Sequence, residues 1–237
     1  MTTERGETAT TPMLDGGTSG MSAMSAMSAM PDVPFPPRRA QRAPLLIVLS
    51  GPSGVGKTTL TRTLVSQGWP GHIVVTATTR RPRPGEIDGT HYHFYSEEQF
   101  RDLITRDQLL ERAEVHGNWY GVPATTVRER LQAGQDVLLT IDPQGAQTIR
   151  TRTQGACFVF LAPESLDELV ARLDARNSDG PEQRALRLMN AEREMAELGR
   201  YDYAIINRQG HFDEAVAQLN AIITAEHCRV NAPAVVV

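Results

Sequence analysis

The chain has 237 residues, 40% of them hydrophobic, and a formal net charge of −4 at pH 7. This length fits one domain of ordinary size with appendages, and the hydrophobic content is enough for a packed core. Because the basic residues are dispersed among acids, the composition does not support a nucleic-acid-binding surface. The sequence has no apolar run of 18 residues, which argues against a membrane-spanning helix.

The first segment, residues 1–43, is dominated by Thr, Gly, Ser and Pro, and it repeats Met-Ser-Ala three times from Met21. It has no apolar periodicity, and its clustered prolines exclude a continuing helix, so we expect a disordered tail. The apolar core of a signal peptide is missing, which favours a soluble cytoplasmic protein. Translation from Met30 or another internal methionine is an open alternative.

A glycine-rich loop follows the first predicted strand. Leu45–Leu49 is a short unbroken apolar run, as expected for a parallel strand buried on both faces. Residues 51–58 match G-x-x-x-x-G-K-[ST], and residues 58–67 show helical spacing before Gly68. Backbone N–H groups and a helix N-terminus then face a bound anion. The sequence therefore predicts nucleoside triphosphate binding by Gly51, Pro52, Ser53, Gly54, Val55, Gly56, Lys57, Thr58 and Thr59.

Lys57 is the single lysine of a chain that has 23 arginines. A compact ammonium fits between phosphate oxygens, whereas the planar fork of arginine does not. We expect Lys57 to reach the β- and γ-phosphates and the Thr58 hydroxyl to ligate Mg²⁺. The alternative, a tight turn without a ligand, would make the position of this lysine accidental.

The remaining pattern alternates strands with helices. Further strands are predicted at residues 73–75, 137–141, 158–161 and 203–206, and helices at 124–133, 165–175 and 213–227. This alternation indicates an α/β fold with a five-stranded parallel sheet flanked by helices. We expect the folded domain at residues 44–229, with its core at 44–75 and 123–229 and a C-terminal tail at 230–237.

Residues 76–122 interrupt the alternation and predict an inserted mixed α/β lobe that holds a second substrate at the carboxyl ends of the strands. Arg80 and Arg83 lie three apart on a Pro- and Gly-rich loop, which favours a rigid grip on an acceptor phosphate. Tyr92 and Tyr120 are candidate hydroxyl donors to the same group.

A second arginine set surrounds a predicted helix break at residues 177–181. Arg172 and Arg176 lie four apart on one helix face, and Arg187 follows the break, so the three are candidates to close over the donor phosphates. Surface arginines at this spacing also form solvated pairs with acids such as Asp174, and the local sequence leaves both interpretations open.

Two carboxylates are candidate nucleotide ligands. Glu111 lies in an apolar-leaning stretch and could accept the ring N–H and amino protons of guanine, while a salt bridge to Arg112 or Arg106 is an equal alternative. Asp142 ends an apolar strand, where an acid often lies near Mg²⁺ or nucleotide. Neither the two cysteines nor His91 and His93 indicate a disulfide or a zinc site.

Five blocks together resemble guanylate kinase in order and spacing: Ser50–Leu60, Thr78–Gly89, Tyr92–Phe94, Gly117–Gly121 and Ile141–Gly145. The likeness extends from about Leu45 to Arg229. It implies a P-loop kinase core with a GMP-binding lobe at residues 76–122 and a short helical lid at about 174–190. The implied reaction is ATP + GMP giving ADP + GDP with Mg²⁺, with dGMP as a further acceptor, in purine nucleotide metabolism and without an obligatory protein partner.

The resemblance also implies residue roles. It assigns the GMP phosphate to Arg80, Arg83, Tyr92 and Tyr120. It assigns the guanine to Thr76, Glu111 and Asp142. It makes Arg172, Arg176 and Arg187 the lid arginines that act on the transferred phosphoryl group, together with Lys57.

Three positions depart from the family pattern. Val122 stands where Ser or Thr usually meets the guanine, Thr140 replaces an acid two residues before Asp142, and Arg208 replaces an acid often found after Asn207. Losing one hydrogen bond costs about 0.5–1.5 kcal/mol, which weakens base recognition without abolishing activity. Val122 also motivates an alternative acceptor, ribose bisphosphate. A non-catalytic phosphopeptide-binding module is the other alternative, and the intact phosphate loop argues against it.

Overall fold

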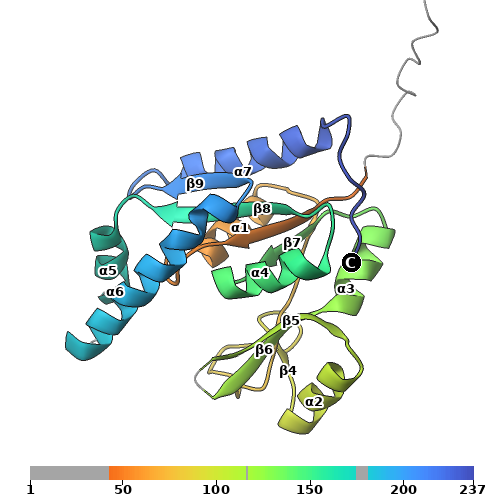
Figure 1. Ribbon diagram of the computed structural model, residues 1–237, viewed down its shortest axis with the longest axis horizontal. Coiled ribbons are helices and arrows are strands. Elements are labelled where there is room, and N and C mark those ends of the chain that lie inside the picture. Colours follow the sequence, from red (N-terminus) through yellow and green to blue (C-terminus); the bar gives the residue numbers. More distant parts are fainter. Residues whose placement is uncertain (1–42, 116, 175–180) are drawn as a thin grey trace, which may run out of the picture. The chain divides into compact units, whose positions relative to one another are not determined.

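A computed structural model describes residues 43–115, 117–174 and 181–237 (Figure 1). The predicted disordered tail lies outside the described residues except for its last position, and so does Arg176. The side chain of Arg187 is also outside the description. None of the described helices is long and apolar enough to cross a membrane.

A five-stranded parallel sheet forms the centre of the core, in the order β2-β7-β1-β8-β9. Its strands are β1 (Leu46–Ser50), β2 (His72–Ile73), β7 (Val137–Thr140), β8 (Cys157–Pro163) and β9 (Tyr203–Asn207). The prediction of such a sheet is confirmed. The second strand is shorter than predicted, although the backbone N–H of Val74 still donates to Leu138 O at 3.0 Å.

Helices cover both faces of this sheet because alternate residues of β1 point to opposite sides. Ile47 and Leu49 belong to one buried cluster, and Leu46 and Val48 belong to the other. Buried residues of α1 (Lys57–Ser66), α5 (Leu166–Asp174), α6 (Pro181–Ala196) and α7 (Phe212–His227) complete the first cluster. Buried residues of α3 (Ala124–Gln132) and α4 (Pro143–Arg152) complete the second.

The helix α4 was not predicted, although its start carries a recognisable signal. Asp142 caps the helix by accepting a hydrogen bond from Gly145 N at 2.7 Å, and Pro143 occupies the first turn. Proline is favoured there because its missing N–H would be unpaired in any case. Apart from Ile149, α4 carries few large apolar side chains, so helical periodicity is weak.

The inserted lobe has a four-stranded mixed sheet in the order β4-β3-β6-β5. Its elements are β3 (Ala77–Thr78), β4 (His93–Phe94), α2 (Glu97–Thr105), β5 (Leu109–Val115) and β6 (Asn118–Pro123). A capping box starts α2, since the Ser96 side chain accepts a hydrogen bond from Gln99 N and the Gln99 side chain accepts one from Ser96 N. Phe100 and Leu109 are buried together with Ala77 in a small separate cluster.

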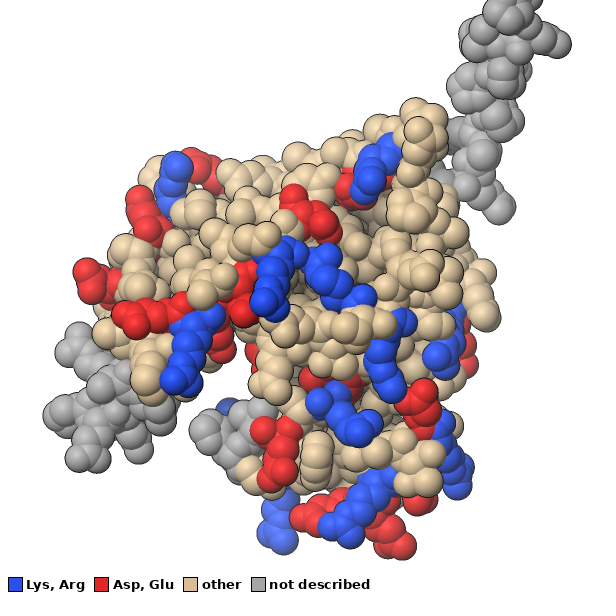
Figure 2. All heavy atoms as spheres, in the orientation of Figure 1, with Lys and Arg blue, Asp and Glu red and all other residues tan. Residues whose placement is uncertain are grey.

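The helix α6 continues past the predicted lid boundary, to Ala196, and a 3-10 helix, η1 (Glu197–Arg200), follows it. After α7, Val236 pairs with Gln154 in an isolated bridge, and Val235 and Val237 pack on the second buried cluster. Acidic and basic side chains are interspersed over the face of the core and lobe shown in Figure 2.

Candidate active site

The phosphate-binding loop connects β1 to α1 and depends on glycine at two tight positions. Gly51 has φ +137°, and a Cβ there would lie 2.1 Å from Leu161 O. Gly56 has φ +108°, and a Cβ there would lie 2.8 Å from Asn207 Nδ2. Because β8 and β9 approach the loop this closely, any larger residue would clash as well as strain the backbone.

Lys57 lies at the first position of α1 and folds back on the loop. Its Nζ donates to Gly51 O at 2.6 Å and to Pro52 O at 3.1 Å. Burial lowers the Lys57 pKa to about 8, while the charges of Glu194 and Asp142 act in the opposite direction. The ammonium is therefore still mostly protonated at neutral pH, inside the loop where a phosphate chain would bind.

Arg172, one of the three predicted lid arginines, lies beside this loop. It donates to Val55 O at 3.4 Å and to Asn207 O at 3.2 Å, and it forms a salt bridge with Glu168. The side chain of Asn207 also donates to Val55 O, at 2.7 Å. The described residues thus hold Arg172 behind the loop, with Glu168 as an acidic partner, and the side chain of Asp174 lies outside the described residues.

Glu194, on α6, reaches the loop from a distant part of the chain and was not predicted as a site residue. Its Oε2 accepts a hydrogen bond from Ser53 N at 3.2 Å. Burial raises the pKa of the Glu194 carboxyl, while the Ser53 N–H and Lys57 act to lower it. No local motif marks this glutamate, because the contact joins residues 141 positions apart.

The acceptor arginines lie on the loop between β3 and β4 and share one carboxylate. Arg80 donates to both oxygens of Glu86 at 2.8 and 2.9 Å, and Arg83 N donates to Glu86 Oε2 at 2.7 Å. The Arg80 guanidinium also lies over the Tyr92 ring, 5.3 Å from its centroid. Hydrogen bonding to Glu86 raises the pKa of Arg80. Glu86 was not predicted as a site residue, although its position three residues after Arg83 is a usable signal.

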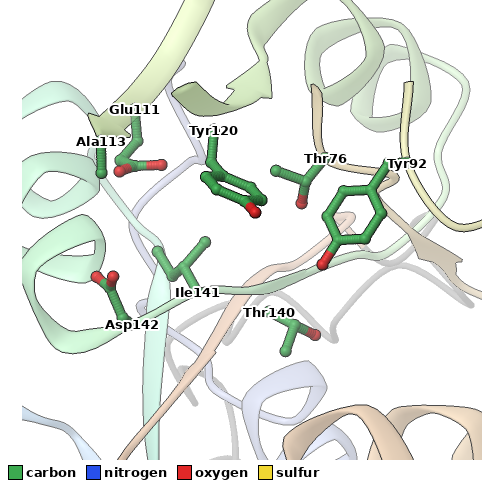
Figure 3. Close-up of a pocket in the computed structure, with 8 residues that line it drawn as sticks. All are labelled: Thr76, Tyr92, Glu111, Ala113, Tyr120, Thr140, Ile141 and Asp142. Carbon is green, nitrogen blue, oxygen red and sulfur yellow. The ribbon is translucent and has the colours of Figure 1, made fainter. Parts of the chain in front are cut away.

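Five predicted GMP ligands line one cavity of about 290 Å³ (Figure 3). They are Thr76, Tyr92, Glu111, Tyr120 and Asp142, and Ala113, Thr140 and Ile141 complete the lining. In Figure 3 the two carboxylates lie on one side of Tyr120, and the hydroxyls of Thr76 and Tyr92 lie on the other side. The rings of Tyr92 and Tyr120 meet edge to face at 6.0 Å.

Glu111 is a buried carboxylic acid, with only 7% of the residue exposed. Burial raises its pKa to about 7, and the nearby charge of Asp142 adds to the shift. The expected alternative, a salt bridge to Arg112 or Arg106, is not formed among the described residues. The acid therefore faces the cavity, where a ligand with two hydrogen-bond donors would compensate its burial.

Two of the departures from the family pattern lie near this cavity. Val122 pairs with Glu111 across β5 and β6 but is only 1% exposed and packs in the second buried cluster. Thr140 lines the cavity, and its Oγ1 is buried without a hydrogen-bond partner within the described residues.

A second cavity, of about 590 Å³, lies between α1 and the lobe and shares Thr76, Tyr92 and Thr140 with the first. Thr58 lines it from the start of α1. Among the described residues, no group of three His, Cys, Asp or Glu side chains could hold a metal ion. The exposed Thr58 hydroxyl instead fits Mg²⁺, which proteins commonly bind through one or two side chains and substrate phosphates.

Comparison with known proteins agrees with this geometry. A family model described as guanylate kinase matches residues 43–226. A guanylate kinase of Desulfitobacterium hafniense is 46% identical over 80% of this chain and 94% of its own length, and one of Dechloromonas aromatica is 45% identical over 76% and 88%. The crystal structure of guanylate kinase from Anaplasma phagocytophilum superimposes with a TM-score of 0.63 at 29% identity, over 81% of this chain and 90% of that chain.

Proposed function

This chain belongs to the guanylate kinase family, and we propose that it transfers the γ-phosphoryl group of ATP to GMP, giving ADP and GDP. The observation that carries the proposal is the cavity of Figure 3, which Glu111 and Asp142 line together with Thr76, Tyr92 and Tyr120. Guanine presents two adjacent donors, its ring N–H and its amino group, which adenine does not. The two carboxylates therefore favour guanine over adenine, because they can accept hydrogen bonds from both donors of the guanine edge.

Donor binding depends on the loop and on Lys57. The Lys57 ammonium exchanges the carbonyls of Gly51 and Pro52 for oxygens of the β- and γ-phosphates. Backbone N–H groups of residues 53–59 surround the chain of phosphates. Thr58 is the residue that would hold Mg²⁺, which supplies positive charge to the phosphate oxygens. Arg172 adds a guanidinium behind the same phosphates. Arg176 and Arg187, whose side chains lie outside the described residues, are proposed to act on them as well.

Acceptor binding depends on the lobe. Arg80 and Arg83 bind the phosphate of GMP, with the hydroxyls of Tyr92 and Tyr120 as further donors, and Thr76, Glu111 and Asp142 bind the base. Since phosphoryl transfer needs little covalent help from the protein, alignment of the two substrates and stabilisation of charge account for the rate. All proposed ligands come from one chain, so the reaction needs no protein partner. We also place it in the cytoplasm, in purine nucleotide metabolism.

Acceptor profiling tests this proposal. ADP release is measured with Mg²⁺-ATP and GMP, dGMP, AMP or ribose 1,5-bisphosphate on the full chain. We expect turnover with GMP and dGMP and background rates with AMP and ribose 1,5-bisphosphate. Background rates with GMP would refute the proposal. Turnover with ribose 1,5-bisphosphate alone would instead support the alternative acceptor that Val122 suggests.

A further inference from the structure

The Glu194 carboxylate binds the same loop that the donor phosphates need. Its Oε2 accepts from Ser53 N at 3.2 Å, and Ser53 belongs to the loop between Gly51 and Gly56. Backbone N–H groups of this loop are the usual ligands of the phosphate chain in such kinases. We propose that Glu194 is an internal competitor of ATP, whose carboxylate binds the phosphate loop and has to leave it before the donor binds.

The charges around the loop indicate that the Glu194 carboxylate opposes binding of the donor phosphates rather than supporting it. Lys57 is the cation inside the loop, and Glu194 and Asp142 both act on it electrostatically. A triphosphate that enters brings several further negative charges beside these two carboxylates. Like charges at short range repel, and most strongly where water is largely excluded. Glu194 therefore lowers the affinity of the loop for the donor as long as its side chain stays on Ser53.

The backbone of α6 explains how the carboxylate can leave. Ala191 is 3% exposed and packs in the first buried cluster, so this part of α6 is fixed to the core. Glu194 lies three residues later on the same helix face, and a flexible side chain carries its carboxylate. A rotation of the Glu194 side chain is enough to free Ser53 N, and the helix itself can stay in place.

This inference rests on the proposed donor site but not on the identity of the acceptor. Binding of ADP, with EDTA present to exclude Mg²⁺, is measured by calorimetry on the full chain. We expect Glu194→Gln to bind ADP about five- to tenfold more tightly than the unmodified protein, and Glu194→Ala at least as tightly as Glu194→Gln. The matched control is Glu192→Gln, which removes the same charge from an exposed position of the same helix and should stay within about twofold.

Each result decides the question. Unchanged or weaker ADP binding in both Glu194 variants would overturn the inference, because it would make Glu194 a neutral or supporting residue. Equal tightening in Glu192→Gln would overturn it too, by reducing the effect to net charge. In turnover, Glu194→Gln should lower the KM for ATP and leave the KM for GMP unchanged. Absence of GMP phosphorylation by the unmodified chain would refute the proposed function and still leave the ADP measurement valid.

Discussion

Replacing Glu111 with glutamine should stabilise the fold and damage the site. The folded protein raises the Glu111 pKa from 4.5 to about 7, first through burial and then through Asp142. A carboxyl with a raised pKa holds its proton more strongly in the folded state, so stability falls as pH rises from about 4.5 to about 7. The full penalty applies above pH 7 and amounts to about 3 kcal/mol. Glutamine has a similar shape and does not ionise.

Urea denaturation of Glu111→Gln and the unmodified protein at pH 5 and pH 8 measures this effect. The free energies of unfolding should differ by about 1 kcal/mol at pH 5 and by about 3 kcal/mol at pH 8, in favour of the variant. Glu114→Gln is the matched control, because Glu114 is an exposed acid of the same strand, and it should not reproduce the gain of about 3 kcal/mol at pH 8. An advantage of Glu111→Gln that is equal at both pH values, or a loss at pH 8, would refute the assigned cause.

The same ionisation sets the pH dependence of acceptor binding. Only the carboxylate form of Glu111 accepts both guanine donors, so the KM for GMP should fall as pH rises from 6 to 8. In Glu111→Gln the KM for GMP should be higher and nearly independent of pH over this range. The burial that destabilises the Glu111 carboxylate in the free protein would therefore favour ligand binding. A carboxylate already hydrogen-bonded within the protein could not accept the two guanine donors.

Three further variants test the loop and the lobe. Lys57→Ala should lower kcat by at least a hundredfold, corresponding to about 2.7–4 kcal/mol of transition-state stabilisation, and near-normal turnover would contradict its role. Arg83→Ala should raise the KM for GMP and leave that for ATP within about twofold, and an unchanged KM for GMP would count against the proposed grip. Gly51→Ala should destabilise the fold by about 2–4 kcal/mol in thermal melts, because its Cβ would meet Leu161 O. Gly68→Ala, with φ +93° but open space around it, is the control and should cost about 1–2 kcal/mol, the strain of a Cβ at positive φ alone.

The central strands β1 and β8 of the parallel sheet were predictable because they are buried on both faces and therefore unbroken in their apolar character. Every residue of β1 and β8 is buried, so the local composition and the burial agree. The strand β6 was missed for the opposite reason. Its residues Asn118–Gly121 alternate only weakly in polarity, and their strand conformation depends on pairing with β3 and β5. Such pairing depends on the tertiary fold, and a short stretch of sequence does not reveal it.

The residues of the candidate site also fall into two groups, those marked by a local motif and those brought to the site by tertiary packing. Lys57, Arg80 and Asp142 lie in short motifs whose spacing is fixed by the loop or strand end that carries them, so the sequence alone pointed to them. Glu194 reaches Ser53, and Asn207 reaches Val55 from 152 positions away, because α6 and β9 pack beside the loop only in the folded chain. Sequence motifs therefore point to the groups proposed to bind the substrates, whereas the side chains that contact the phosphate loop from distant parts of the chain appear only in the structure. Glu194 is the sharpest example, since its carboxylate contacts the loop in the structure and no pattern around residue 194 indicates it.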